Sequence, residues 1–169
     1  MYNLQQILLY VSSLAAVALA VFVFIKNQKN TVSVSFAGLC AASFLWLFSY
    51  ARMLTASFET VSVWIKSGTV GMILVPAFSM FFILSFIKTP VKKTTLWVTA
   101  VITIIFTGLV LFSDLFINRV NINGWGPYPR AGELHFLFII YAVSIILFAL
   151  HKAYKYIKND DITSIKKYK

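Results

Sequence analysis

Five long apolar runs, separated by polar stretches, dominate the pattern of hydrophobic and polar positions along the chain. A helix that crosses a bilayer needs about 20 mostly apolar residues, because its backbone hydrogen bonds must all be made internally. The pattern therefore predicts an all-α, polytopic transmembrane bundle of five membrane-spanning helices within residues 1–158, with a basic segment over 159–169. The predicted spans cover about residues 7–25, 32–53, 61–87, 96–112 and 134–150.

Residues 43–87 are the centre of this pattern, because two apolar runs are joined there by a short polar turn. Arg52 closes the first of these runs, Glu59 lies in the turn, and Lys66 lies shortly after the start of the second run. The stretch predicts a transmembrane hairpin with its charged groups at one membrane face. Pro76 stands in the middle of the later run, where it removes one backbone hydrogen bond and predicts a kink.

Small residues recur at four-residue spacing in the first three runs, and this spacing lets neighbouring helices approach closely. They are Ser12, Ala16 and Ala20 in the first run, Gly38 and Ala42 in the second, and Ser67 and Gly71 in the third. Trp46 comes late in the second run, at a depth where aromatic side chains prefer the membrane interface.

Two features of the fourth run and of the segment after it bear on packing. Four threonines, Thr95, Thr99, Thr103 and Thr107, fall on one stripe. They could form a polar lining, but a threonine hydroxyl can also bond to its own helix, and we favour that interpretation. The connection over 113–133 is long and polar, and its three glycines and two prolines predict that no helix continues through it.

Composition supports a membrane protein. The chain is 60% apolar and 12% charged, which leaves too few polar residues to cover a soluble domain. The net charge of +10 does not indicate a nucleic-acid partner, because the basic residues cluster between apolar runs and form no interleaved aromatic platform of the kind that nucleic-acid binding needs. Cys40 is the one cysteine, so the sequence predicts no disulfide framework and no metal cluster. No cofactor is expected.

The distribution of basic residues predicts the orientation. Eleven lysines fall in one set of connections, whereas only four basic residues fall in the opposite set. Basic connections face the cytoplasm, so we expect the N-terminus outside and the C-terminus in the cytoplasm of a multi-pass protein of the cell (inner or plasma) membrane. The four basic residues of the outer face are Arg52, Lys66, Arg119 and Arg130. Lys26 follows the first apolar run instead of preceding it, so we interpret that run as a retained helix and not a signal peptide.

Motifs of catalysis and transport are missing from the sequence. The chain has no Walker loop, no HExxH, no GxSxG and no two acidic residues within one span. Cation pumps rely on a buried ionisable group near the midplane, whereas Lys66 lies near a helix end. His135 and His151 lie at opposite ends of the fifth run, so they cannot share a metal. The sequence therefore argues against an enzyme and against a pump.

The outer face gathers the candidate ligand-binding residues. If the helices form one bundle, these groups could cap a pocket between helix ends, although anchoring at the lipid interface is the favoured role for any single one of them. Glu59 lies seven residues from both Arg52 and Lys66, so its carboxylate could bridge two helix ends. The candidates are Arg52, Glu59, Trp64, Lys66, Arg119, Trp125, Tyr128, Arg130, Glu133 and His135.

Several of these motifs resemble a known family. The run Leu45-Trp46-Leu47-Phe48-Ser49-Tyr50 is similar to the end of the second helix in the N-terminal seven-transmembrane sensor region of bacterial histidine kinases. The family's third helix is resembled by Trp64, Gly71, Pro76, Phe81, Phe82 and Phe86. Its outer loop and fifth helix are resembled by Gly126-Pro127-Tyr128, Phe138 and Tyr141. The resemblance extends over roughly residues 5–158. The resemblance implies structural roles for Trp46, Gly71, Pro76 and Pro127 and no catalytic residues.

The resemblance implies a non-catalytic sensor or receptor input module for two-component signal transduction, which detects an extracellular or membrane-borne ligand. Its partners would be the lipid bilayer, a small ligand at the outer face, and a cytoplasmic kinase domain or a second copy. The chain departs from the family in having five predicted spans instead of seven and no kinase motifs, so we expect a fragment or a short relative. Residues 160–169 resemble the turn before the family's sixth helix, or form a basic tail. A small carrier or transporter subunit and a scaffold protein are the alternatives.

Overall fold

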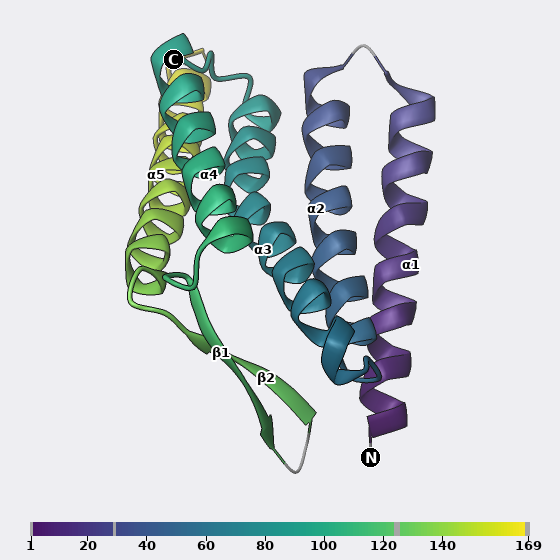
Figure 1. Cartoon of the computed structure of the whole chain (residues 1–169). Coiled ribbons are helices and arrows are strands. Elements are labelled where there is room, and N and C mark those ends of the chain that lie inside the picture. The colour runs from purple at the N-terminus through teal and green to yellow at the C-terminus, as the bar shows by residue number, and fades with distance from the viewer. Residues whose placement is uncertain (1, 29, 124–125, 168–169) are drawn as a thin grey trace.

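The fold is known from a computed structural model, which describes residues 2–28, 30–123 and 126–167. Within these ranges the chain forms five helices and one β-hairpin (Figure 1). All five helices are long and apolar enough to cross a membrane, so the predicted all-α polytopic bundle is confirmed. The elements are α1 (Tyr2–Lys26), α2 (Thr31–Met53), α3 (Phe58–Phe86), α4 (Lys93–Phe112), β1 (Ile117–Asn123), β2 (Gly126–Ala131) and α5 (His135–Lys167).

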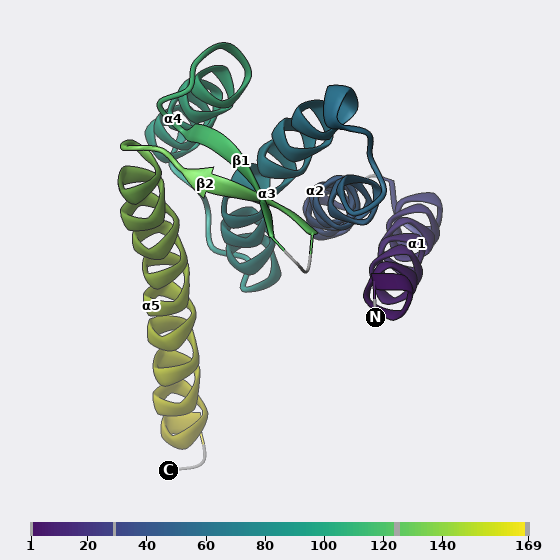
Figure 2. The ribbon, with the colours of Figure 1, turned by 60° about the horizontal axis from the view of Figure 1, so that its bottom comes forward.

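Helix α3 is the centre of the arrangement. It packs on α2 on one side and on α4 and α5 on the other, while α1 packs on the outer side of α2 (Figure 2). The hairpin lies at the end of the molecule where α2 meets α3, and the turns from α1 to α2 and from α3 to α4 lie at the opposite end (Figure 1). We call these two ends the hairpin end and the turn end.

The interface between α2 and α3 depends on small residues. A Cβ atom at Gly71 would lie 2.5 Å from the backbone nitrogen of Trp46 and 2.9 Å from the carbonyl oxygen of Ala42. The two backbones therefore approach closely, as the four-residue spacing predicts. The prediction is wrong in detail for α1, because Ser12 is exposed and its neighbour Ser13 is fully buried.

Helix α3 changes neighbours along its length. Its N-terminal half packs closely on α2, whereas Met80 and Leu84 in its C-terminal third, with Ile87 just after the helix, form a cluster with Ala149 of α5. Contacts with α2 in that third are made by side chains, such as the ring pair Phe36 and Phe82 at 5.4 Å. Figure 1 shows that α3 and α2 diverge toward the turn end. Pro76 lies inside the helix between these two regions, where it cannot donate a backbone hydrogen bond.

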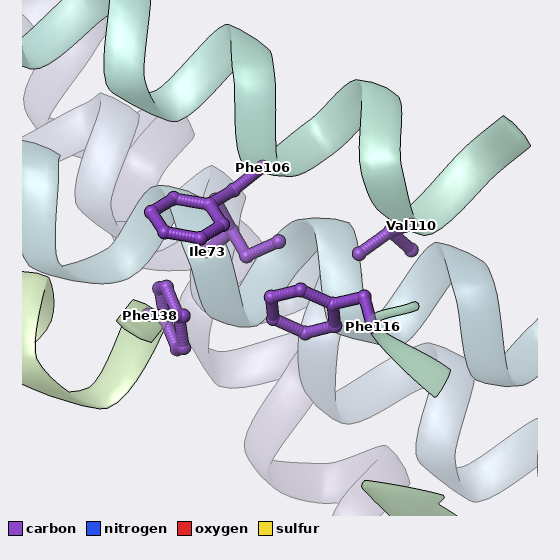
Figure 3. Packing of buried hydrophobic residues seen from close by; sticks show 5 residues of the cluster. All are labelled: Ile73, Phe106, Val110, Phe116 and Phe138. Carbon is purple, nitrogen blue, oxygen red and sulfur yellow. The ribbon is translucent and has the colours of Figure 1, made fainter. Parts of the chain in front are cut away.

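A cluster of aromatic rings forms the core beneath the hairpin. Phe106, Phe116 and Phe138 come from α4, from the segment before β1 and from α5, and they meet Ile73 and Val110 (Figure 3). Their ring centroids are 5.6 to 6.0 Å apart. Tilted and edge-on pairs at such distances are favourable beyond the area that they bury. The cluster fixes the stem of the hairpin to three helices.

The connection that we predicted as a polar loop contains an antiparallel β-hairpin. Val120 pairs with Pro129 and Arg119 with Arg130, and the register is irregular between Ile117 and Arg119. Two backbone hydrogen bonds fix its stem, from Gly132 N to Phe116 O at 2.9 Å and from Leu134 N to Leu115 O at 3.0 Å.

Helix α5 continues well beyond the fifth apolar run and ends at Lys167. Residues 151–167 include neither glycine nor proline, so nothing in this segment interrupts the helix after the apolar part ends. Hydropathy therefore predicts the length of the span but not the length of the helix.

Candidate functional site

A cavity of about 190 Å³ lies between the hairpin and the adjoining parts of α2, α3 and α5, and we call it the hairpin cavity. Met72, Phe116 and Ile117 give it apolar walls. Pro129 and Ala131 of β2 close it on the hairpin side. The polar groups that line it are those of Tyr50, Thr69, Tyr128, Arg130 and His135. An apolar cavity with a few convergent polar groups is typical of a ligand site in a helix bundle.

Two helices place polar side chains on the membrane side of the hairpin cavity. Gly68 lets the ring of Tyr50 lie against α3, because a Cβ atom there would be 2.8 Å from Tyr50 Cδ2. The hydroxyl of Thr69 donates to the carbonyl oxygen of Ile65 at 2.8 Å. Its oxygen can still accept a hydrogen bond from a ligand.

His135 connects the hairpin cavity to the aromatic core. Its ring centroid lies 5.0 Å from that of Phe116 and 6.2 Å from that of Phe138. His135 is also the first residue of α5. A ligand that contacts this imidazole therefore contacts the start of α5.

Arg130 and Arg119 occupy opposite positions on the two strands, and both are exposed. Like charges at directly opposite positions in an antiparallel pair repel each other. Only Arg130 lines the hairpin cavity. The repulsion between the two guanidinium groups favours binding of an anion beside them. Because Arg119 carries the same charge but does not line the hairpin cavity, it can serve as a control for substitutions of Arg130.

The charged residues of the α2–α3 turn form a separate group. The guanidinium carbon of Arg52 lies 5.3 Å from the ring centroid of Trp64, and Lys66 Nζ donates to the carbonyl oxygen of Leu111 at 3.1 Å. Arg52 and Lys66 thus have partners other than Glu59, which is exposed. Among the described residues, no ion pair joins Glu59 to Arg52 or Lys66, and Lys66 reaches the end of α4 instead.

The remaining candidates lie elsewhere. Glu133 lines a shallow pocket with Asp114, Leu115 and Asn118, apart from the hairpin cavity. Pro127 lies in β2 opposite Ile122. Trp125 lies outside the described residues.

Sequence reasoning missed several lining residues of the hairpin cavity. Tyr50 was noted as the end of the motif that begins at Leu45, and Thr69 stood out in no pattern. Phe116 was treated as part of a polar loop, although it is fully buried. One sequence signal could have indicated the hairpin that Phe116 precedes. The apolar positions Val120 and Ile122 alternate with polar ones just before Asn123-Gly124, a typical hairpin turn sequence.

The groups that line the hairpin cavity indicate what it can bind. In the described part of the chain, no group of three or more His, Cys, Asp or Glu residues is placed to hold a metal ion. The polar groups of the hairpin cavity are phenol and alcohol hydroxyls, a guanidinium and an imidazole. These groups suit a small polar or anionic molecule.

Comparison with known proteins gives one match. Residues 8–166 match the family model described as the N-terminal 7TM region of histidine kinase. No curated protein and no solved structure matches the chain. The family match covers nearly the whole chain and includes the hairpin as well as most of each helix. The chain therefore belongs to the family of N-terminal seven-transmembrane regions of histidine kinases.

Proposed function

We propose that this chain is the non-catalytic input module of a bacterial histidine kinase and that it senses a small anionic ligand in the hairpin cavity. The observation that carries the proposal is the convergence of Arg130, His135 and Tyr50 on one cavity from three different elements. Family membership and the five apolar helices support a membrane sensor region.

The size and lining of the hairpin cavity limit the class of ligand. Ligand sites usually enclose about 300 to 1,000 Å³, and this cavity of about 190 Å³ is smaller. Arg130 can form charge-assisted hydrogen bonds with a carboxylate or phosphate. The tyrosine and threonine hydroxyls can bond to further oxygens. A small carboxylate with a short apolar body fits this lining.

The proposed orientation places the hairpin cavity outside the cell. The lysine-rich turns and the end of α5 then lie in the cytoplasm, where a kinase domain or a second copy is the proposed partner. Ligand binding and kinase control thus involve opposite ends of α5. The family is a seven-transmembrane region, so we propose that five of its helices are present here and that two further helices complete the bundle.

Thermal unfolding of the purified chain in detergent tests the ligand class. Acetate, butyrate and benzoate are the probes, and the variants are Arg130→Gln and its matched control Arg119→Gln. We expect at least one carboxylate to raise the unfolding midpoint of the wild type and of Arg119→Gln. Arg130→Gln should weaken that binding about tenfold or more, since a hydrogen bond to a charged group contributes about 1.5 to 3 kcal/mol. If no probe stabilises the wild type, or if both variants behave alike, the proposed ligand class is wrong.

A signalling experiment tests the sensor role itself. Phosphohistidine on the associated kinase is measured in cells that express the wild type, Arg130→Gln or Arg119→Gln, with membrane insertion checked for each. We expect Arg130→Gln to change the phosphohistidine level while Arg119→Gln leaves it unchanged. Equal, normal signalling by both variants would show that the hairpin cavity does not control the kinase.

A further inference from the structure

A second cavity lies at the turn end, and with about 570 Å³ it is larger than the hairpin cavity. It is bounded by the start of α2, the C-terminal third of α3, the turn after α3 and the first turn of α4. We call it the turn cavity. Its volume falls within the usual range of ligand sites. It lies where α2 and α3 diverge (Figure 1).

The side of the turn cavity that reaches into the membrane is apolar. Val34, Phe78, Phe81 and Leu96 contribute to it. Val34 is 46% exposed and Leu96 38% exposed, although both lie on membrane-spanning helices. Hydroxyl groups come from Ser35 and Ser85, whose oxygens are 3.5 Å apart. An acyl chain matches such a surface better than a polar solute does.

Lys88 lines the turn cavity and has an unusual backbone conformation. Its φ is 52°, in the left-handed region that normally favours glycine. Lys88 N donates to Ser85 O and Thr89 N to Leu84 O, the two hydrogen bonds of a helix end that glycine usually completes. Glycine would adopt this backbone conformation at a lower energetic cost than lysine does. An unfavourable residue at such a position indicates that its side chain has a use.

The described side chains around the turn cavity carry charges of one sign. Lys92 and Lys152 line an adjoining cavity that shares Thr89, Pro90 and Val91 with it. Among the side chains described, 4–28, 30–121 and 126–158, every carboxylate lies at the hairpin end. The first residue of α2, Thr31, also lines the turn cavity, and a helix N-terminus favours an anion. The potential here is complementary to an anionic head group.

We propose that the turn cavity binds an anionic phospholipid from the adjacent leaflet, with an acyl chain along Phe78 and Phe81 and the phosphate at the ammonium group of Lys88. Because the site opens toward the lipid, the lipid composition of the membrane would influence how far α2 and α3 separate at the turn end. This inference is independent of the ligand in the hairpin cavity, which lies at the other end of the molecule.

Native mass spectrometry of the full chain, released from detergent micelles, tests the proposal. The probes are phosphatidylglycerol and phosphatidylcholine with identical acyl chains, and inorganic phosphate is a competitor. The variants are Lys88→Gly, which suits the left-handed backbone, Lys88→Arg, which keeps the charge, and Lys93→Gln, which removes an exposed lysine outside the turn cavity. Val34→Trp fills the apolar side and is a second test should Lys88→Gly fail to fold.

We expect the wild type to retain phosphatidylglycerol in preference to phosphatidylcholine. Lys88→Gly should weaken phosphatidylglycerol binding about fivefold, the contribution of one lysine near an anionic lipid surface, whereas Lys88→Arg and Lys93→Gln should bind like the wild type. Val34→Trp should weaken binding of the whole lipid. Equal retention of the two lipids, equal effects of Lys88→Gly and Lys93→Gln, or complete competition by inorganic phosphate would overturn the proposal.

Discussion

At the scale of single residues, the surroundings of two helical glycines decide what each position tolerates. A Cβ atom at Gly71 would meet the backbone of α2, whereas one at Gly108 would meet nothing within 4 Å. A side chain can rotate away from a new methyl group, but a packed backbone must move as a whole. The same substitution should therefore have opposite effects at the two positions.

We predict that Gly71→Ala lowers the free energy of unfolding by about 1 to 3 kcal/mol, the usual cost of overpacking. Gly108→Ala should be neutral or should raise it by up to about 1 kcal/mol, because alanine is the better helix former. Unfolding in mixed micelles with increasing SDS measures both. Similar values for the two variants would show that α2 and α3 are not in close contact at Gly71.

Two buried serines allow a similar comparison for hydrogen bonds. Ser13 and Ser49 are both fully buried. The hydroxyl of Ser13 donates to the carbonyl oxygen of Tyr10 at 2.8 Å, whereas Ser49 Oγ has no partner among the described residues. We predict that Ser13→Ala costs about 0.5 to 1.5 kcal/mol and that Ser49→Ala is neutral or stabilising. SDS unfolding tests this, and an equal loss in both variants would assign a hydrogen bond to Ser49.

At the scale of elements, the threonine stripe of α4 faces α5. Thr103 bonds to Thr99 O of its own helix at 2.8 Å, as we favoured from the sequence. Its hydroxyl oxygen also lies 3.0 Å from the hydroxyl oxygen of Tyr141 on α5. Thr99 and Thr103 of the stripe therefore stabilise the pairing of α4 with α5.

We predict that Tyr141→Phe lowers the free energy of unfolding by about 0.6 to 1.7 kcal/mol, the range of interhelical hydrogen bonds in membranes. Ser144→Ala is the control, since among the described residues the Ser144 hydroxyl bonds within α5, to Ile140 O at 2.7 Å. It should change the value by less than about 0.5 kcal/mol. A larger loss for the control would mean that hydroxyl loss in α5 matters irrespective of the partner.

The sequence signal of the helices is strong and that of the hairpin is weak, for a physical reason. A span must be apolar along its whole length, so about 20 residues carry the signal together. The strands are short, and the irregular register between Ile117 and Arg119 interrupts the alternation that would reveal them. The hairpin cavity was predicted only in part, because Arg130 and His135 carry chemistry visible in the sequence while Thr69 and Phe116 gain their roles from packing.

At the scale of the whole molecule, the charges predict the orientation in the membrane. We predict that the hairpin end is outside. Single cysteines at Asn118 and Gln28, both exposed and at opposite ends, are placed in a Cys40→Ser background. An impermeant thiol reagent should label position 118 in intact cells and position 28 only after the membrane is opened. The reverse pattern would invert the orientation and place the hairpin cavity in the cytoplasm.

Helix α5 has the dimensions of a lever. Its 33 residues give a rod of about 50 Å, whereas the hydrocarbon layer is about 30 Å thick. Close packing around Phe138 supplies a pivot near its start. A tilt of about 5° at His135 would displace the far end of such a rod by about 4 Å. A small change in the tilt of α5 at the hairpin end thus becomes a larger displacement of its C-terminal end, without any change in secondary structure.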